Sequence, residues 1–215
     1  MKILALDVAT NTGWAVYDTD RHESAITCGT LSLSKAIPKG SKVTDRRHIA
    51  TAALDEALCR LVAAYRPDYA IVELPLGRIE SHTRKSKGMF ADHDDGNQSG
   101  GPNADTVLML NQLFATATCV IRHKVSGFET VSPRTWQVAI TKGLPGSSTK
   151  DRSMAFVSAI GVQYPPTLNK KDKEDAADAV CLAVWCYRNS QHLKILQAAR
   201  EDSAGKMIRS NNVEA

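Results

Sequence analysis

The sequence predicts an α/β domain built on a mixed sheet, partly antiparallel and partly parallel, with helices on its faces. Two observations support this fold class. Near the start, three short runs rich in β-branched or aromatic residues are separated by turn formers, as in an antiparallel meander: ILALDVA, GWAVYDT and SAITCGTLSL. After them, two further strand-length runs alternate with stretches of helical periodicity, and a strand-helix-strand succession favours parallel crossovers.

Each later element has its own signal. Between residues 45 and 65, apolar residues recur at helical spacing, and Arg66-Pro67 ends that helix because a residue before proline rarely stays helical. The run DYAIVELP predicts a buried fourth strand that stops at Pro75. Beyond it, the pattern predicts helices over 103–123, 149–161 and 174–188, a short strand over 127–132 and a helical turn over 133–141.

The chain has the size of one ordinary domain. Its 215 residues can bury a core, and a hydrophobic content of 43% argues against disorder. We expect this domain to span residues 1–190. Residues 76–102 lose all periodicity and gather Gly, Ser, Asp, Lys and Arg, which indicates an inserted loop that is either functional or disordered. Residues 191–215 are expected to form a helical extension with a flexible polar tail.

The composition argues against membrane and secreted classes. No apolar stretch approaches the roughly 18 uncharged residues of a membrane span, and the start MKILALD has no signal-peptide pattern. The five cysteines are an odd number and form no C-x-x-C pair, which indicates a reduced compartment without structural zinc. We therefore expect an intracellular protein.

The positive charge is unevenly distributed. The net charge is +4, and residues 142–173 hold six basic residues against two acidic ones. Such a local excess suggests a polyanionic partner, although a solvated face explains it as well. The basic residues are Lys142, Lys150, Arg152, Lys170, Lys171 and Lys173.

Four carboxylates occupy unusual positions. Asp7 ends the first predicted strand and Glu73 ends the fourth, while Asp175 and Asp178 lie three residues apart on the last strong helix and so share one face. Like charges at the edge of a core repel and are costly to desolvate unless a cation neutralises them. Magnesium is the natural candidate, because it prefers hard oxygen ligands and keeps several waters.

Each acid also has an ordinary explanation. Asp7 could start a turn, Glu73 could be a strand-end charge, and Asp175 could be a first-turn acid favoured by the helix dipole. The combination is more specific than any member, because independent surface charges have no reason to end two strands and also flank one helical stripe. The sequence therefore predicts a metal-dependent site formed by all four.

Six segments of the chain, in order, match the pattern of one known family: ILALDVATNTGWAVYD, PDYAIVELP, NADTVLMLNQLFATATCVI, VSPRTWQVAI, SSTKDRSMAFVSAIG and DAADAVCLAVWC. The most specific element is D-A-A-D-A after two strand-end acids. On these segments, which cover about residues 1–190 without the loop at 76–102, the chain resembles the RuvC-type Holliday-junction resolvases, with a closer likeness to phage-encoded members.

The resemblance implies a ribonuclease-H-like fold, with a mixed five-stranded sheet flanked by helices. It implies a cytoplasmic homodimer, in a bacterial or phage-infected cell, that resolves four-way DNA junctions by paired nicking. The enzyme would be a magnesium-dependent endonuclease with two Mg²⁺ ions per active site, for which Mn²⁺ could substitute. The family's four acids correspond to Asp7, Glu73, Asp175 and Asp178, and the lysine of its basic helix start corresponds to Lys150.

Three segments depart from the family pattern. Val8-Ala9 follow the first acid, where the family typically has proline and a small residue. Gln137 occupies a basic position of the family, for which Lys142 is a candidate substitute. The aromatic residues often found after the second acid are replaced by residues 74–76, which puts the family's way of opening the junction in question here.

DNA binding is expected to rest on phosphate contacts from residues 142–173, with minor help from the loop. The loop carries a net charge of +3 over residues 78–88, and Phe90 or Met89 is its candidate apolar wedge at the crossover; a plain surface loop is the alternative. The residues expected to contact DNA are Lys142, Lys150, Arg152, Arg84, Lys85, Lys87 and Phe90.

Two further expectations concern apolar surfaces. Trp136 is expected to pack in the core rather than stack on a base, because buried aromatic residues are mainly core material. The helix at 103–123 is the expected surface for a homodimer, which the resemblance implies.

Three other functions share some of these sequence features. A phosphotransferase of the actin and sugar-kinase class also begins with an Asp at the end of its first strand, but it needs a second domain and a second phosphate loop that this chain lacks. A nuclease for RNA–DNA hybrids or for branched DNA in general could use the same four acids. A non-catalytic junction-binding protein is disfavoured because all four acids are present.

Overall fold

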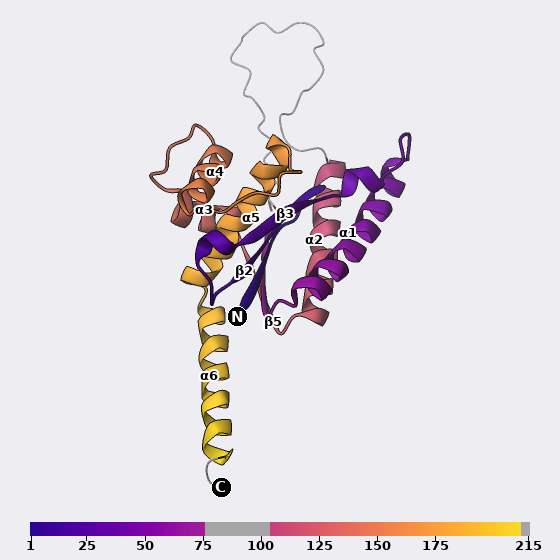
Figure 1. Cartoon of the computed structure of the whole chain (residues 1–215). Coiled ribbons are helices and arrows are strands. Elements are labelled where there is room, and N and C mark those ends of the chain that lie inside the picture. Colours follow the sequence, from indigo (N-terminus) through magenta and orange to yellow (C-terminus); the bar gives the residue numbers. More distant parts are fainter. Residues whose placement is uncertain (76–103, 212–215) are drawn as a thin grey trace, which may run out of the picture.

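The computed structural model describes residues 1–75 and 104–211, the last of these, 204–211, as backbone alone. A five-stranded sheet with the order β3-β2-β1-β4-β5 runs through its centre (Figure 1). β1 pairs with β2 and β2 with β3 in antiparallel fashion, whereas β1 pairs with β4 and β4 with β5 in parallel, so the predicted mixed sheet is confirmed. The strands are β1 Lys2–Asp7, β2 Asn11–Asp18, β3 Thr27–Ser32, β4 Tyr69–Glu73 and β5 Gly127–Val131.

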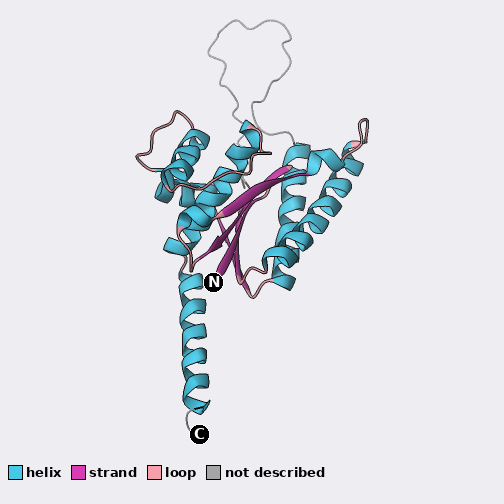
Figure 2. Ribbon diagram, viewed as in Figure 1, coloured by secondary structure: helices cyan, strands magenta, loops and turns pink. Residues whose placement is uncertain are grey.

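The helices lie close to their predicted ranges. α5 differs most, because it begins at Lys170 rather than 174, where the Asn169 side chain accepts a hydrogen bond from the amide of Asp172 and caps the first turn. Two short 3₁₀ helices, η1 Glu23–Ala25 and η2 Leu33–Ala36, flank β3. The α-helices are α1 Val43–Tyr65, α2 Ala104–Lys124, α3 Pro133–Thr141, α4 Thr149–Ala159, α5 Lys170–Asn189 and α6 Gln191–Asn211 (Figure 2).

The sheet separates two hydrophobic cores. On one face α5 packs across β1 and β2, with α3 and α4 outside it; on the other face α1 and α2 lie side by side (Figure 1). Along β1, Ile3 and Ala5 belong to the α5 core, while Leu4 and Leu6 belong to the α1/α2 core. This alternation follows from the two-residue period of a strand, and it decides which face each later residue joins.

A close approach between α5 and β2 depends on Gly13. A Cβ atom at this position would lie 2.1 Å from the backbone oxygen of Asp175. The sequence predicts that the small residues after Asp7 make a tight hairpin and leave room for metal and a phosphate. At Gly13 that expectation is wrong, because the room is taken by the backbone of α5.

The α2 helix has an unusual composition for its place in the fold. By length and composition α2 could cross a membrane, although its longest uncharged run, residues 106–121, is shorter than the roughly 18 uncharged residues of a typical span. The helix packs on α1 and the sheet through one side, where Leu113, Ala117 and Ile121 are buried, while most of its apolar window stays unburied in the described part of the chain. Its other side leaves Leu108 49% exposed.

Candidate active site at the carboxyl end of the sheet

Strand parity places two acids on one face at one end of the sheet. Leu6 pairs with Val72 in the parallel ladder between β1 and β4, so Asp7 and Glu73 follow on adjacent strands. Ile71, like Ala5, belongs to the α5 core, and residues two further along each strand face the same way. Asp7 and Glu73 therefore both lie on the face covered by α5.

The α5 helix supplies the other two predicted acids. Asp175 and Asp178 are only 7% and 8% exposed, and they lie one turn apart on the helix face that meets the sheet. The approach at Gly13 sets their position, since Gly13 is the antiparallel partner of Asp7 and its missing side chain admits the backbone of Asp175. Three segments far apart in the sequence thus converge on one spot.

The charges of these acids disturb one another. Loss of hydration, reinforced by the nearby charges of Glu73 and Asp178, raises the pKa of Asp7 well above its usual range. Burial, with a further contribution from Asp178, raises the pKa of Glu73 to about 7. Burial also raises the pKa of Asp178. Crowded carboxylates with raised pKa values are typical of functional sites rather than of structural ion pairs.

Lys150 provides the positive charge of the cluster. Its Nζ lies 2.5 Å from Asp175 Oδ1 and 3.8 Å from Asp178 Oδ2. Partial burial acts to lower the pKa of Lys150, but the hydrogen bond and charge of Asp175 outweigh it and raise the pKa. A capping box between Ser148 and Asp151 fixes the start of α4, which brings Lys150 to this place.

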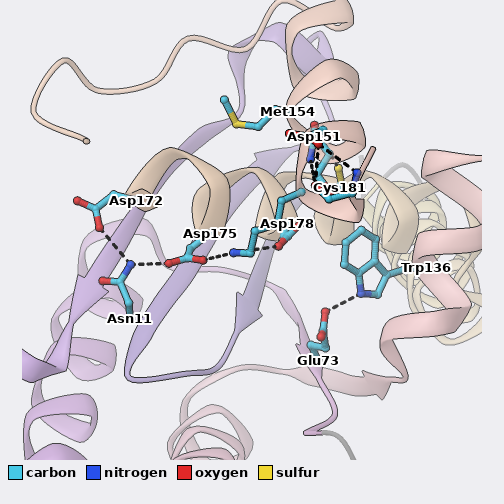
Figure 3. Close-up of polar contacts among 12 residues, drawn as sticks. Asn11, Glu73, Trp136, Asp151, Met154, Asp172, Asp175, Asp178 and Cys181 are labelled. Carbon is cyan, nitrogen blue, oxygen red and sulfur yellow. Dashed lines mark hydrogen bonds and ion pairs between the residues drawn. The ribbon is translucent and has the colours of Figure 1, made fainter. Parts of the chain in front are cut away.

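Two positioning contacts were not foreseen from the sequence. Asn11 Nδ2 donates to Asp175 Oδ2 at 2.6 Å and to Asp172 Oδ1 at 3.1 Å, and Trp136 Nε1 donates to Glu73 Oε2 at 2.6 Å (Figure 3). Trp136 is fully buried, so its predicted packing role is confirmed. The hydrogen bond from Trp136 to Glu73 could have been expected on chemical grounds, because a buried indole N–H needs an acceptor. For Asn11 the sequence holds no comparable signal.

The donor set suits a hard divalent cation, although no closed coordination shell is formed. Within residues 1–75 and 104–203, no three His, Cys, Asp or Glu side chains are gathered closely enough to hold a metal ion. Asp178 Oδ1 is buried and makes no hydrogen bond of full geometry among these residues, although the Ser153 hydroxyl lies near enough to act on the pKa of Asp178. An orphaned carboxylate oxygen beside acids with raised pKa values is what a cation such as magnesium would satisfy, so the residues fit the group chemically.

The overall arrangement is shared with solved resolvases. T. thermophilus RuvC in complex with a Holliday junction substrate superposes with a TM-score of 0.53 at 10% identity, over 87% of this chain and 95% of that chain. A second Thermus thermophilus RuvC structure gives 0.50 at 13% identity, over 87% and 96%. The yeast mitochondrial Holliday junction resolvase Ydc2 gives 0.52 at 11% identity, over 84% and 75%. The chain has the resolvase fold. No protein-family model and no curated protein sequence matches it.

Next to the acids on this fold, α3 and α4 enclose a basic hollow of about 350 Å³. Lys142 and Gln137 line the same hollow, so Lys142 lies near the position at which the resolvase pattern has a basic residue. Arg152 also lines it, and its Nε is buried without a partner in the described part of the chain. Thr149 lines the hollow, and the next residue, Lys150, contacts Asp175, so the hollow and the acids are reached from consecutive residues of α4.

The remaining predicted DNA contacts lie outside the described residues. They are Arg84, Lys85, Lys87, Phe90 and Met89, all within the predicted loop at 76–102. Leu74 and Pro75, which replace aromatic residues of the family, are described, and the amide of Leu74 donates to the carbonyl oxygen of Val131 at 2.8 Å. This contact continues the pairing of β4 with β5 beyond Glu73.

Proposed function

We propose that this protein is a magnesium-dependent endonuclease that resolves four-way DNA junctions by paired nicking. One observation carries the proposal: four carboxylates from β1, β4 and α5 converge with Lys150 at the carboxyl end of a sheet that has the resolvase fold. One fold neighbour was solved with a Holliday junction substrate and another is named a Holliday junction resolvase, and that substrate is extended to this chain as part of the proposal.

The proposed reaction is hydrolysis of a phosphodiester bond. A water oxygen attacks the phosphorus in line with the leaving 3′ oxygen, so the new P–O bond forms as the P–O3′ bond breaks; the attacking water gives up a proton and the leaving O3′ takes one up. Asp7, Glu73 and Asp178, drawn closer together than they lie in the described structure, would hold two magnesium ions, which would supply charge neutralisation and a water of lowered pKa. Mn²⁺ would substitute, because it accepts the same oxygen ligands.

In the proposed reaction, Lys150 contacts the DNA phosphate and Asp175 positions Lys150. The Lys150 ammonium would meet a non-bridging oxygen of the scissile phosphate and stabilise the charge that develops there. Asp175 holds the ammonium through its Oδ1 and is itself held by Asn11 through its Oδ2. Asp175 would therefore position Lys150, in addition to the role in metal binding that its place in the family pattern implies.

Paired nicking requires two active sites, and we propose a homodimer formed through α2. The exposed side of this apolar helix includes Leu108, and a second copy would cover it. Analytical ultracentrifugation checks this directly. A protein that stays monomeric at the concentrations used for cleavage would contradict paired nicking.

A substrate panel tests the activity. A labelled four-way junction, a linear duplex and an RNA–DNA hybrid are each incubated with Mg²⁺, with Mn²⁺ or with EDTA, and the cut sites are mapped. We expect symmetric nicks in the junction, with either metal and not with EDTA. Preferential cutting of the hybrid would identify a ribonuclease on the same fold. Junction binding without any cutting would identify a binding protein.

A further inference from the structure

A second basic hollow lies on the other side of the candidate site. It has a volume of about 400 Å³ and is formed where the first turns of α1 and α2 meet the hairpin that follows β1. Two adjacent arginines, Arg46 and Arg47, and two threonines contribute polar groups, and apolar side chains complete the lining. The lining residues are Thr10, Val43, Arg46, Arg47, Asp105, Thr106, Met109 and Leu110.

The two arginines are available to a ligand. The arginine ion pairs within residues 1–75 and 104–203 involve Arg21, Arg60, Arg188 and Arg200. Arg46 Nε donates to the carbonyl oxygen of Ser41 at 2.9 Å, which holds the side chain while leaving its terminal nitrogens without a described partner. Asp105, the acid in the lining, is engaged in interactions of its own.

Helix geometry adds to the positive character of this hollow. Val43 and Thr106 belong to the first turns of two helices of more than twenty residues, whose amino ends carry partial positive charge. The α1 cap residue, Lys42, makes no side-chain capping bond, so the first amides of α1 are not satisfied by a cap. Two guanidinium groups beside two helix starts favour an anion that offers several oxygens.

The hollow is close to the acids. Thr10 lines it, and the next residue, Asn11, donates to Asp175 at 2.6 Å. Because Thr10 and Asn11 are consecutive, with Cα atoms about 3.8 Å apart, one short segment reaches both the hollow and the acids. The α3/α4 hollow is joined to the acids in the same way through Thr149 and Lys150. The α3/α4 pair and the α1/α2 pair lie on opposite sides of the sheet (Figure 1), so the two basic hollows flank the segment that carries the carboxylates.

We infer that the α1/α2 hollow binds a phosphate group of the nucleic-acid substrate, next to the phosphate that is cut. A strand that crosses the carboxyl end of the sheet would meet the α3/α4 hollow, the acids and the α1/α2 hollow in turn. Arg46 and Arg47 bind phosphate oxygens, and Met109 and Leu110 offer apolar contact to the sugar. This inference rests on the proposed function, because it assigns a further contact of the same substrate.

The double variant Arg46→Ala/Arg47→Ala tests the inference. Binding to a synthetic four-way junction is measured in EDTA over a range of salt concentrations, with sedimentation velocity and thermal unfolding on the same samples. Losing the contact with one phosphate reduces the slope of log K against log salt by about 0.9, so we expect a slope shallower by about 0.9 and weaker binding at every salt concentration.

The matched control is Arg60→Ala/Lys124→Ala. These residues also carry two positive charges on α1 and α2 but lie toward the other ends of those helices; Arg60 is about 21 Å from Arg46 along α1. For the control, the slope of log K against log salt is expected to stay nearly unchanged. The variant Arg46→Lys/Arg47→Lys keeps both positive charges and is expected to keep most of that slope.

The outcomes are separable. Equal slopes for the Arg46/Arg47 variant, its control and the unmodified protein would overturn the inference and leave the proposed function standing. A changed sedimentation coefficient with an unchanged slope would also overturn it, since the hollow would then serve contact between copies. If the unmodified protein neither binds nor cuts the junction, the proposed function itself fails.

Discussion

The carboxylates at the two ends of β4 have pKa values shifted in opposite directions. Asp68, just before the strand, accepts a hydrogen bond from the Lys2 amide at 2.8 Å and one from Arg200 at 2.8 Å. Partial burial opposes them, but these two contacts lower the pKa of Asp68. Glu73, at the other end, has its pKa raised to about 7 by burial and a neighbouring carboxylate. At one end of β4 the charge of Asp68 is paired with Arg200, and at the other end Glu73 lies close to another carboxylate.

We propose that this difference distinguishes a structural acid from a functional one. A carboxylate that only stabilises the fold finds donors and a cation of its own, as Asp68 does. Asp7, Glu73 and Asp178 are held where their ionised forms are disfavoured, which costs stability and is expected only where a ligand or reaction needs the charge. Substitutions of the paired acid and of the crowded acids should therefore have different effects on cleavage and stability, the largest of them at Asp7.

The largest effect is expected from Asp7→Asn. Cleavage of a four-way junction in Mg²⁺ should fall by more than about 10³-fold, because several kcal/mol of charge stabilisation are lost and each 1.36 kcal/mol is worth tenfold. Junction binding in EDTA should survive, and the metal-free protein should unfold at a higher temperature, since one of the crowded charges is gone.

Asp68→Asn is the matched control for Asp7→Asn. It should cut within about twofold of the unmodified rate and unfold at a slightly lower temperature, because it loses a paired charge. Full cleavage activity in Asp7→Asn would contradict the assignment of the metal site, whatever the control does.

The second effect is a pH dependence of stability in EDTA. The pKa of Glu73 is higher in the folded protein, about 7, than its ordinary value of 4.5, so the folded state binds more protons between these values and stability falls as pH rises through them. At 1.36 kcal/mol per unit, the Glu73 contribution is about 3 kcal/mol. Urea unfolding from pH 4.5 to 8 measures it.

Glu73→Gln should flatten much of this dependence, leaving the part due to Asp7 and Asp178, whose pKa values are also raised. Mg²⁺ should restore stability at pH 8 in the unmodified protein, because a bound cation compensates the crowded carboxylates. A stability that rises from pH 4.5 to 7 in EDTA would show that the crowding is not present in solution.

The smallest effect is expected from Trp136→Phe. Phenylalanine fills most of the buried space but removes the N–H that donates to Glu73, and a hydrogen bond to a charged group is worth about 1.5–3 kcal/mol. Ionised Glu73 is then less favoured, so cleavage near pH 7 should fall about tenfold and recover as the pH is raised. A uniform loss at every pH would indicate that Trp136 only packs.

Local patterns were sufficient for much of the fold and for the four acids. The two-residue period of β1 and β4 places Asp7 and Glu73 on one face, and the three-residue spacing of Asp175 and Asp178 places them on one side of α5. These are short-range regularities, and they hold wherever the elements are finally packed. The same regularity accounts for Val8, which departs from the family pattern and lies in the α1/α2 core.

Only the tertiary structure decided how these elements meet. Gly13 admits the backbone of α5 beside β1, Asn11 holds Asp175, Trp136 donates to Glu73, and Lys150 lies against Asp175. Each contact joins residues 25 or more positions apart, and no periodicity within a window of the sequence can report which distant side chain a donor will reach. By itself the sequence determined the acids and the faces on which they lie. Packing across the sheet determined their partners, because close contact between α5 and β2 is possible only where a side chain is missing.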